Sequence, residues 1–122
     1  MKSLRFPPGK YCEIYGFTVR NRVVEYFLEN LGTEIAVGDM AKEIGISRPK
    51  AYQIIDELMR RNYVLKDRII GKTQLYQLNK DNLIVKIFMR NFNECLNIIV
   101  EEHSKKKTSN SSARIAVSAK GI

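Results

Sequence analysis

Residues 36–64, AVGDMAKEIGISRPKAYQIIDELMRRNYV, contain two helical patterns joined by a turn, and the rest of the chain can be interpreted around them. In its first half, apolar residues recur at the spacing that places them on one face of a helix: Val37, Met40, Ala41 and Ile44. Gly45 follows them and can adopt the left-handed backbone conformation that closes a helix end. We therefore expect a helix of about two turns that ends at Gly45.

A second helix is expected to begin at Arg48, after a turn through Ile46. The side-chain oxygen of Ser47 can cap its free N–H groups, and Pro49 suits a first turn, where the N–H needs no partner. The residues that face the core are apolar and recur at helical spacing: Ala51, Ile54, Ile55 and Leu58. The other face of this helix is polar, so the helix has one face for the core and one that is free to bind a ligand.

The start of the second helix carries side chains that suit DNA: Ser47, Arg48, Pro49, Lys50, Tyr52 and Gln53. A helix, a turn that begins with Gly and a second helix with this polar N-terminal half are typical of a DNA-binding helix-turn-helix. Arg and Lys bind phosphate or the guanine edge, whereas Gln pairs with adenine in the major groove. An ordinary helical hairpin with a solvated polar face is the alternative interpretation of this stretch.

The length and the charge of the chain limit its function classes. Its 122 residues suffice for one small domain with appendages, and its net charge of +8 favours a polyanionic partner such as nucleic acid or an anionic membrane surface. The excess positive charge lies in residues 48–80 and 104–122. No apolar run is long enough to cross a membrane and no signal peptide is recognisable, so we expect a cytoplasmic protein without membrane contact.

No pattern in the sequence indicates catalysis or metal binding. It lacks paired carboxylates in a pocket-forming context, a phosphate-cradling glycine loop and a nucleophile motif. Cys12 and Cys95 are too few and too far apart for a zinc site. We expect reduced thiols, with a disulfide between them or between two copies of Cys95 as the alternative. The sequence thus predicts no catalytic residue, no metal and no cofactor.

The segment before the motif suggests how the domain begins. Residues 1–17 mix prolines and glycines with aromatic residues, so we expect an irregular or extended N-terminal arm that packs on the body or on a partner subunit. Thr18 caps a helix whose apolar residues step by four up to Leu31, and residues 34–36 are expected to form a short strand. Residues 18–80 are then the DNA-binding domain.

A β-hairpin is predicted after Asn62, which suits a left-handed helix end. Residues 73–78 alternate between polar and apolar side chains, and Gly71 marks the tip. We expect the core to receive Tyr76 and Leu78 with Gln74, rather than Leu75 and Gln77. Polar residues near the tip are candidates to bind phosphates or enter the minor groove: Arg68, Lys72, Thr73 and Gln74. A plain solvated hairpin is the alternative.

The last predicted element is one long helix over residues 81–104. Its apolar residues include a heptad seam, the pattern of helices that pack in pairs: Val85, Phe88, Phe92, Cys95 and Ile99. Since so small a domain has little core left to cover the whole apolar face, we expect a dimer interface with a second copy. A helix folded wholly onto its own domain is the alternative. Residues 105–122 are expected to form a flexible basic tail.

With this order of elements, roughly residues 18–100 resemble archaeal and bacterial winged helix-turn-helix regulators. The resemblance rests on V-G-D-M-A-K-E-I-G-I-S-R-P-K-A-Y-Q-I-I-D-E-L-x-R-x-N-Y-V, followed by I-I-G-K-T-Q-L-Y-Q-L-N. The chain is most similar to small ArsR/MarR-type proteins of archaeal style, in which a C-terminal helix pairs two protomers. Ala36 departs from the pattern, which usually has Ser or Thr capping the first motif helix. No ArsR-like metal-sensing Cys cluster is present, so metal sensing is not implied.

The expected fold class is therefore α+β, mainly α, with a winged helix-turn-helix domain and a long C-terminal dimerisation helix. The expected function is a homodimeric, sequence-specific transcription regulator that binds double-stranded DNA, with its recognition helix in the major groove and its β-wing on the backbone or in the minor groove. Two alternatives stay open: an architectural or DNA-partition protein that coats DNA with low sequence specificity, and a winged helix used only for protein–protein assembly. The sequence identifies no effector.

Overall fold

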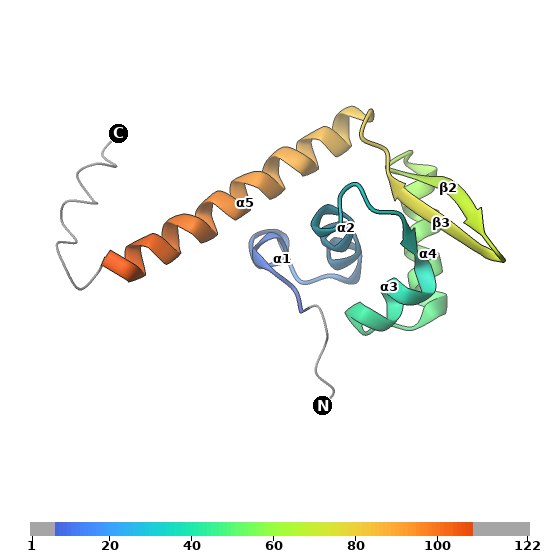
Figure 1. The fold of residues 1–122 in the computed structure, drawn as a ribbon, viewed down its shortest axis with the longest axis horizontal. Helices are drawn as coiled ribbons and strands as arrows, with labels where there is room; N and C mark the ends of the chain where they lie inside the picture. The colour runs from blue at the N-terminus through green and yellow to red at the C-terminus, as the bar shows by residue number, and fades with distance from the viewer. Residues whose placement is uncertain (1–6, 109–122) are drawn as a thin grey trace.

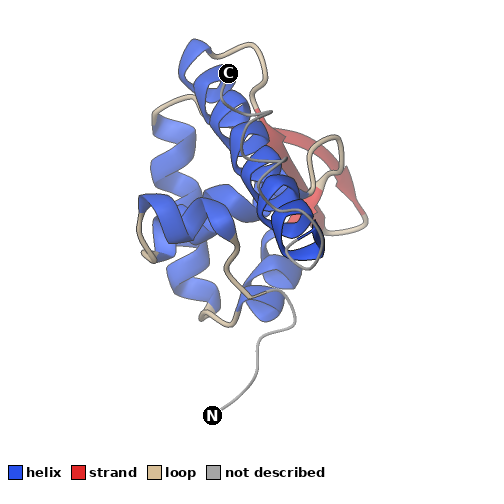
Figure 2. Cartoon of the chain, turned by 90° about the vertical axis from the view of Figure 1, so that its left-hand side faces the viewer, coloured by secondary structure: helices blue, strands red, loops and turns tan. Residues whose placement is uncertain are grey.

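The computed structural model describes residues 7–108, with side chains up to residue 105. From residue 19 onward the helices and strands follow the predicted order and confirm the mainly α, winged helix-turn-helix fold (Figure 1). The strands gather on one side of a helical body (Figure 2). The elements are α1 Lys10–Tyr15, α2 Val19–Glu29, β1 Ile35–Ala36, α3 Val37–Ile44, α4 Arg48–Arg60, β2 Val64–Ile70, β3 Thr73–Leu78 and α5 Leu83–Thr108.

The helix-turn-helix forms as the sequence predicts. α3 ends at Ile44, and Gly45 adopts a left-handed φ of 77°. The Oγ of Ser47 accepts a hydrogen bond from the backbone N of Lys50 at 3.2 Å, which caps the start of α4. Ala36 provides no side-chain cap for α3. The helix begins at Val37, directly after β1 ends at Ala36.

The wing is an antiparallel sheet with the strand order β1-β3-β2. Lys66 pairs with Tyr76 and Ile69 pairs with Gln74, so between these pairs two residues of β2 face one residue of β3. This arrangement is a β-bulge, which bends a strand and changes the face that the following side chains occupy. β2 and β3 are joined at Gly71, whose φ of 63° allows the tight turn.

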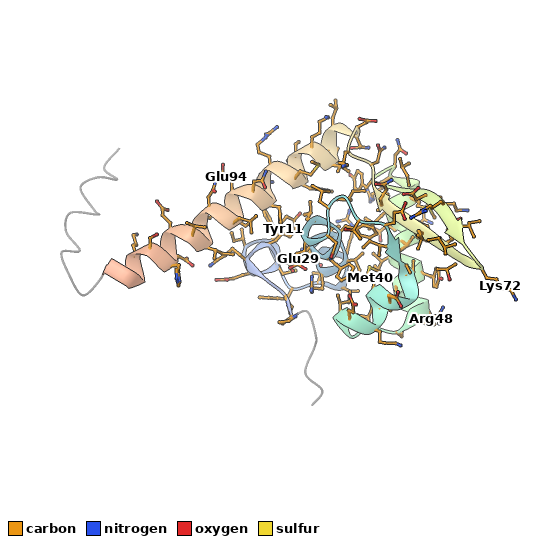
Figure 3. The ribbon with its side chains drawn as sticks, in the orientation of Figure 1. Tyr11, Glu29, Met40, Arg48, Lys72 and Glu94 are labelled. Carbon is orange, nitrogen blue, oxygen red and sulfur yellow. The ribbon has the colours of Figure 1, made fainter. Side chains whose placement is uncertain are left out.

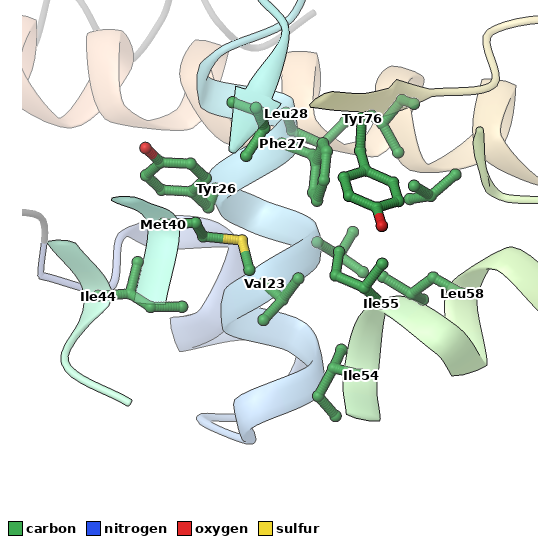
Figure 4. Close-up of a cluster of buried hydrophobic side chains, with 14 of the residues drawn as sticks. Val23, Tyr26, Phe27, Leu28, Met40, Ile44, Ile54, Ile55, Leu58 and Tyr76 are labelled. Carbon is green, nitrogen blue, oxygen red and sulfur yellow. The ribbon is translucent and has the colours of Figure 1, made fainter. Parts of the chain in front are cut away.

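The core lies between α2, α3, α4 and the inner face of the wing (Figure 4). Its largest fully buried apolar side chains are Phe27, Met40, Ile55 and Leu58. Tyr76 and Leu78 are buried, as preferred from the alternation. Leu75 is buried as well, but it does not belong to this core cluster. The preferred set is therefore the one that joins the core.

The N-terminal arm differs from the predicted irregular segment because it contains the short helix α1. Buried Glu25 of α2 holds this helix: its carboxylate accepts hydrogen bonds from the backbone N of Gly9 at 3.0 Å and of Cys12 at 3.3 Å. Arg22 donates to the same carboxylate at 3.2 Å. A buried carboxylate needs such partners, and they order a segment whose local sequence is a weak helix former.

The aromatic residues of the arm only partly pack on the body. Tyr11 is buried, with its ring centroid 6.4 Å from that of Phe92 and 4.8 Å from that of Tyr15. Tyr15 and Phe17 remain exposed. Phe6 lies outside the described residues. α1 therefore extends the core toward the long helix and leaves an aromatic surface on its outer side.

α5 begins after the wing and extends past the body at its C-terminal end (Figure 1). The predicted dimer seam needs correction, since most of it faces the chain's own domain: Val85 and Cys95 are 0% and 2% exposed, and Phe88 and Phe92 pack partly buried against the core. The unpredicted helix α1 is what covers the middle of the seam. Ile99 stays 41% exposed. Of the predicted basic tail, residues 109–122 lie outside the described residues.

Candidate nucleic-acid interface

The start of α4 presents the side chains that were predicted to read DNA. All six are exposed, while the apolar positions between them are buried: the exposed set is Ser47, Arg48, Pro49, Lys50, Tyr52 and Gln53. Because the Ser47 Oγ already accepts the capping hydrogen bond from Lys50, its hydroxyl proton is what it can offer to a phosphate oxygen. The helix thus brings donors for phosphate and for base edges to one surface.

The Arg48 side chain packs against Gly38 of α3. A Cβ built on Gly38 would lie 3.3 Å from the Cζ and from one terminal nitrogen of Arg48. Because Gly has no side chain, the guanidinium group can lie directly over the start of α3. The two helices of the motif therefore position the first cation of the recognition surface together.

A cleft of about 620 Å³ separates the starts of α3 and α4 from the wing. Arg48 and Lys72, from opposite sides of it, lie at the same end of the molecule (Figure 3). The cleft is open to a ligand that reaches both α4 and the hairpin. Its polar and charged lining includes Asp39, Lys42, Arg48, Tyr52, Lys72 and Gln74.

The cleft is electropositive. Lys42, Arg48 and Lys72 form no ion pair with any residue in the described part of the chain, and Asp39 is the acidic residue among those lining the cleft. Three cations around one acid concentrate positive potential in a concave surface, where the low-dielectric walls strengthen it. The arrangement suits a phosphodiester strand.

The wing residues that were predicted to contact DNA fall into two groups. Lys72 and Thr73 are exposed at the tip. Arg68 lies instead at the bulge, where its Nε donates to the Glu34 carboxylate at 2.9 Å. The amide of Gln74 donates to the backbone oxygen of Asp67 at 2.8 Å. Both polar groups thus have partners within the hairpin or beside it, although the Arg68 side chain remains 65% exposed, and their contact with DNA stays a prediction.

Lys42 and Gly38 also line the cleft, and the sequence analysis did not predict them as site residues. Lys42 occupies the polar face of α3, where a lysine on a short helix has no distinctive signal. Gly38 carried a signal that could have been used: an isolated Gly inside a helical pattern lowers helix stability and usually has a packing reason. Here the reason is the guanidinium of Arg48.

The two cysteines are free and buried. Burial raises the pKa of the Cys12 thiol to about 12, and burial also raises the pKa of the Cys95 thiol. Both thiols are therefore protonated at neutral pH and unreactive. Over residues 7–108, no cluster of His, Cys, Asp and Glu has the arrangement of a metal site, and no helix is long and apolar enough to cross a membrane.

Apolar side chains remain exposed on α5 and near α1. One group on α5 occupies a heptad register whose other two positions are half-buried Asn91 and exposed Glu94: Ile84, Ile87 and Ile98. This group, which we call the outer stripe, lies beside the seam that the domain covers. The α1 region adds Ile14, Tyr15 and Phe17. Single exposed apolar residues are common on protein surfaces, whereas groups of them mark interaction sites, so these two groups form a candidate interface.

No protein-family model matches the sequence, and the sequences of curated proteins give no match either. Solved structures do match. MepR of Staphylococcus aureus in its DNA-binding conformation aligns with a TM-score of 0.55 and 16% identity, over 90% of this chain and 83% of that chain. MepR described as a transcription regulator of the multidrug efflux pump MepA gives 0.54 and 15%, over 89% and 82%.

The MepR–DNA complex of S. aureus aligns with a TM-score of 0.51 and 15% identity, over 93% of this chain and 88% of that chain. At such identity the likeness concerns the fold. The archaeal ArsR/MarR-like subtype stays a prediction. What the likeness and the element order together establish is the winged helix-turn-helix fold of this chain.

Proposed function

We propose that this chain is a transcription regulator that binds double-stranded DNA through α4 and the wing. The observation that carries the proposal is the cleft in which Lys42, Arg48 and Lys72 lack ionic partners within the described residues, beside exposed Lys50 and Gln53. A polyanion is the ligand that such cations favour. MepR, which has the same fold, has been solved with an oligodeoxyribonucleotide and in a DNA complex, and this supports the proposal.

The proposed docking places α4 in the major groove and the wing beside the adjacent backbone. α4 has 13 residues and is therefore about 20 Å long, and a helix with its side chains fits a groove about 12 Å wide. Gln53 then reads adenine, and Lys50 reads guanine or holds a phosphate. One strand of the backbone runs through the cleft between Arg48 and Lys72, which sets the register of the helix.

We further propose that the regulator works as a homodimer, with a second copy covering the outer stripe of α5 and the exposed residues near α1. The isoleucines of the outer stripe occupy three of five successive positions of a heptad register, and Asn91 and Glu94 occupy the other two. One buried Asn in such a register can specify the pairing of two helices. Two recognition helices would then enter successive major grooves about one helical turn apart, on a near-palindromic site. Such a protein needs no cofactor and acts where the DNA is, in the cytoplasm.

The proposal is tested by selecting bound duplexes from a random DNA pool at a stated salt concentration. We expect a near-palindromic motif whose affinity falls steeply with added salt. Failure to bind any duplex at low salt would overturn the proposal. Footprinting on a selected site addresses the coating alternative, which the basic residues after position 104 favour: discrete protection supports a regulator, whereas spreading protection supports an architectural protein.

A further inference from the structure

We infer that the tip of the wing carries an apolar wedge, Ile69 and Ile70, that enters the minor groove and unstacks one base step, so that the bound DNA is kinked. This inference rests on the proposed function and deepens it, since it states how the wing contributes. The two isoleucines are 62% and 52% exposed. They stand beside the turn at Gly71, at the end of the hairpin that extends farthest from the body (Figure 3).

The strand register places the two isoleucines on opposite faces of the tip. Ile69 pairs with Gln74, and Ile70 pairs with Thr73, so neither has an apolar cross-strand neighbour. Directly opposite residues of an antiparallel pair share a face of the sheet. Ile69 therefore shares the face of Gln74, which lines the cleft, whereas Ile70 projects from the other face.

The bulge is what aims Ile69. In a regular strand, side chains of residues two apart share a face, so Val64 and Lys66 would be followed on the inner face by residue 68. The extra residue between Lys66 and Ile69 shifts this alternation by one and puts Ile69 on the face of the cleft. Both β-branched residues suit an extended hairpin, and more than half of each one's surface remains exposed.

The charges around the tip favour DNA as the partner of these side chains. Lys72, in the turn itself, has no ionic partner in the described part of the chain. The nearby acid Asp67 is already engaged, because one of its carboxylate oxygens accepts a hydrogen bond from Gln77 at 2.8 Å. A narrow tip with one cation and two apolar side chains matches the proteins that insert isoleucine or leucine between base steps of the minor groove.

The size of the tip also argues against a protein partner. Two side chains at the end of a hairpin with a two-residue turn offer far less apolar area than a stable protein interface needs. A base step needs only one or two inserted side chains, because unstacking is local. The cations of the cleft supply most of the affinity, and the isoleucines change the shape of the DNA.

The test uses the full chain and a duplex selected from the random pool, with 2-aminopurine placed at successive minor-groove steps beside the protected site. A second duplex carries a fluorophore at each end and reports bending. The variant is Ile69→Thr with Ile70→Thr, which keeps β-branching and therefore the strand. Leu65→Thr is the matched control, since Leu65 is 42% exposed on the same strand but lies before the bulge.

We expect the parent chain to raise 2-aminopurine fluorescence at one step and to bring the duplex ends closer. The double variant should lose both signals while its affinity falls by no more than about tenfold, and Leu65→Thr should behave as the parent. Parent-like fluorescence and bending by the double variant would overturn the wedge while leaving DNA binding intact. A parent chain that binds no duplex would overturn the proposed function as well, and the binding step shows this before any fluorophore is read.

Discussion

The guanidinium of Arg48 lies over the backbone of Gly38, so close that a Cβ at position 38 would be 3.3 Å from the Arg48 Cζ. Gly38 belongs to α3 and Arg48 begins α4, so this contact links the two helices of the motif at the mouth of the cleft. Gly inside a helix costs up to about 1 kcal/mol relative to Ala. Gly38 is explained here by the space that it leaves for the Arg48 guanidinium.

Gly38→Ala should therefore separate stability from DNA binding. The free energy of unfolding should stay unchanged or rise, because Ala is the better helix former and the guanidinium is a flexible group that can move aside. Affinity should fall by a similar factor for all duplexes, because Arg48 is proposed to contact the DNA phosphate backbone and the added methyl group would displace it. Titration of Gly38→Ala, Arg48→Ala and the double variant should give a coupling energy of about 0.5–1 kcal/mol. Strict additivity would show that Gly38 does not position Arg48.

Gln53→Ala should relax base preference at one position of the selected site. Gln53 is exposed one turn into α4, where its amide can make a bidentate contact with adenine. Loss of that contact should cost about 1–3 kcal/mol at the adenine-bearing site and little at other duplexes. Repeating the pool selection with the variant measures this directly. An unchanged selected motif would exclude Gln53 from base reading.

Lys72→Ala should weaken binding to all duplexes alike and reduce the salt slope by about one. The matched control is Arg68→Ala, because Arg68 is on the same hairpin but pairs with Glu34 at 2.9 Å. Its removal should change the salt slope less. Affinity is measured at several salt concentrations for both variants. Equal slopes for the two would mean that the ion pair opens on binding and that Arg68 contacts phosphate after all.

Ile87→Glu should abolish pairing without unfolding the chain. Ile87 lies in the outer stripe and is 41% exposed in the single chain, so a carboxylate there is solvated in the monomer. In an interface the same group would cost several kcal/mol. Light scattering should give a dimer mass for the parent and a monomer mass for the variant, with similar helix content. Asn93→Glu, an exposed position away from the stripe, should stay dimeric.

A monomer mass for the parent chain would contradict the dimer proposal. Phe92→Glu tests the covered seam and not the dimer, because Phe92 packs against the chain's own core and against the Tyr11 ring. That substitution should lower the free energy of unfolding even at concentrations where the chain is monomeric. The two variants together distinguish the covered seam from the outer stripe.

The buried thiols should make stability depend on alkaline pH. An exposed thiol loses its proton near the ordinary pKa of 9.0, whereas burial raises the pKa of Cys12 in the folded chain to about 12. Between these values the unfolded state binds fewer protons than the folded state, so the free energy of unfolding falls as pH rises and is unaffected below pH 9 by this group. Denaturant titrations from pH 8 to 11 check the sign.

Cys12→Ser, which keeps a hydrogen-bonding group of similar size, serves as the control and should flatten the alkaline decline. A thiol reagent at neutral pH should modify the folded chain slowly and the unfolded chain quickly, since both cysteines are buried. Rapid modification of the folded chain would show that α1 opens readily from Glu25.

The helix-turn-helix and the presence of a wing could be predicted from local sequence patterns alone. Gly45, Ser47 and Asn62 each act within a few residues of their own position, as a helix end, a cap and a left-handed turn. Helical spacing and strand alternation are equally local, because side-chain direction repeats with the backbone period. The exposed set at the start of α4 followed from the same spacing.

Which of these surfaces are covered depends on contacts between elements that are far apart in the sequence. Glu25 orders α1 across 16 residues, and Arg68 finds Glu34 across 34, so neither pairing is encoded in a local pattern. The same holds for the middle of the α5 seam, which α1 covers, and for the bulge that places Ile69 on the same face as Gln74. Burial of a side chain depends on every element that reaches it, whereas a sequence pattern records only the direction in which its own element points.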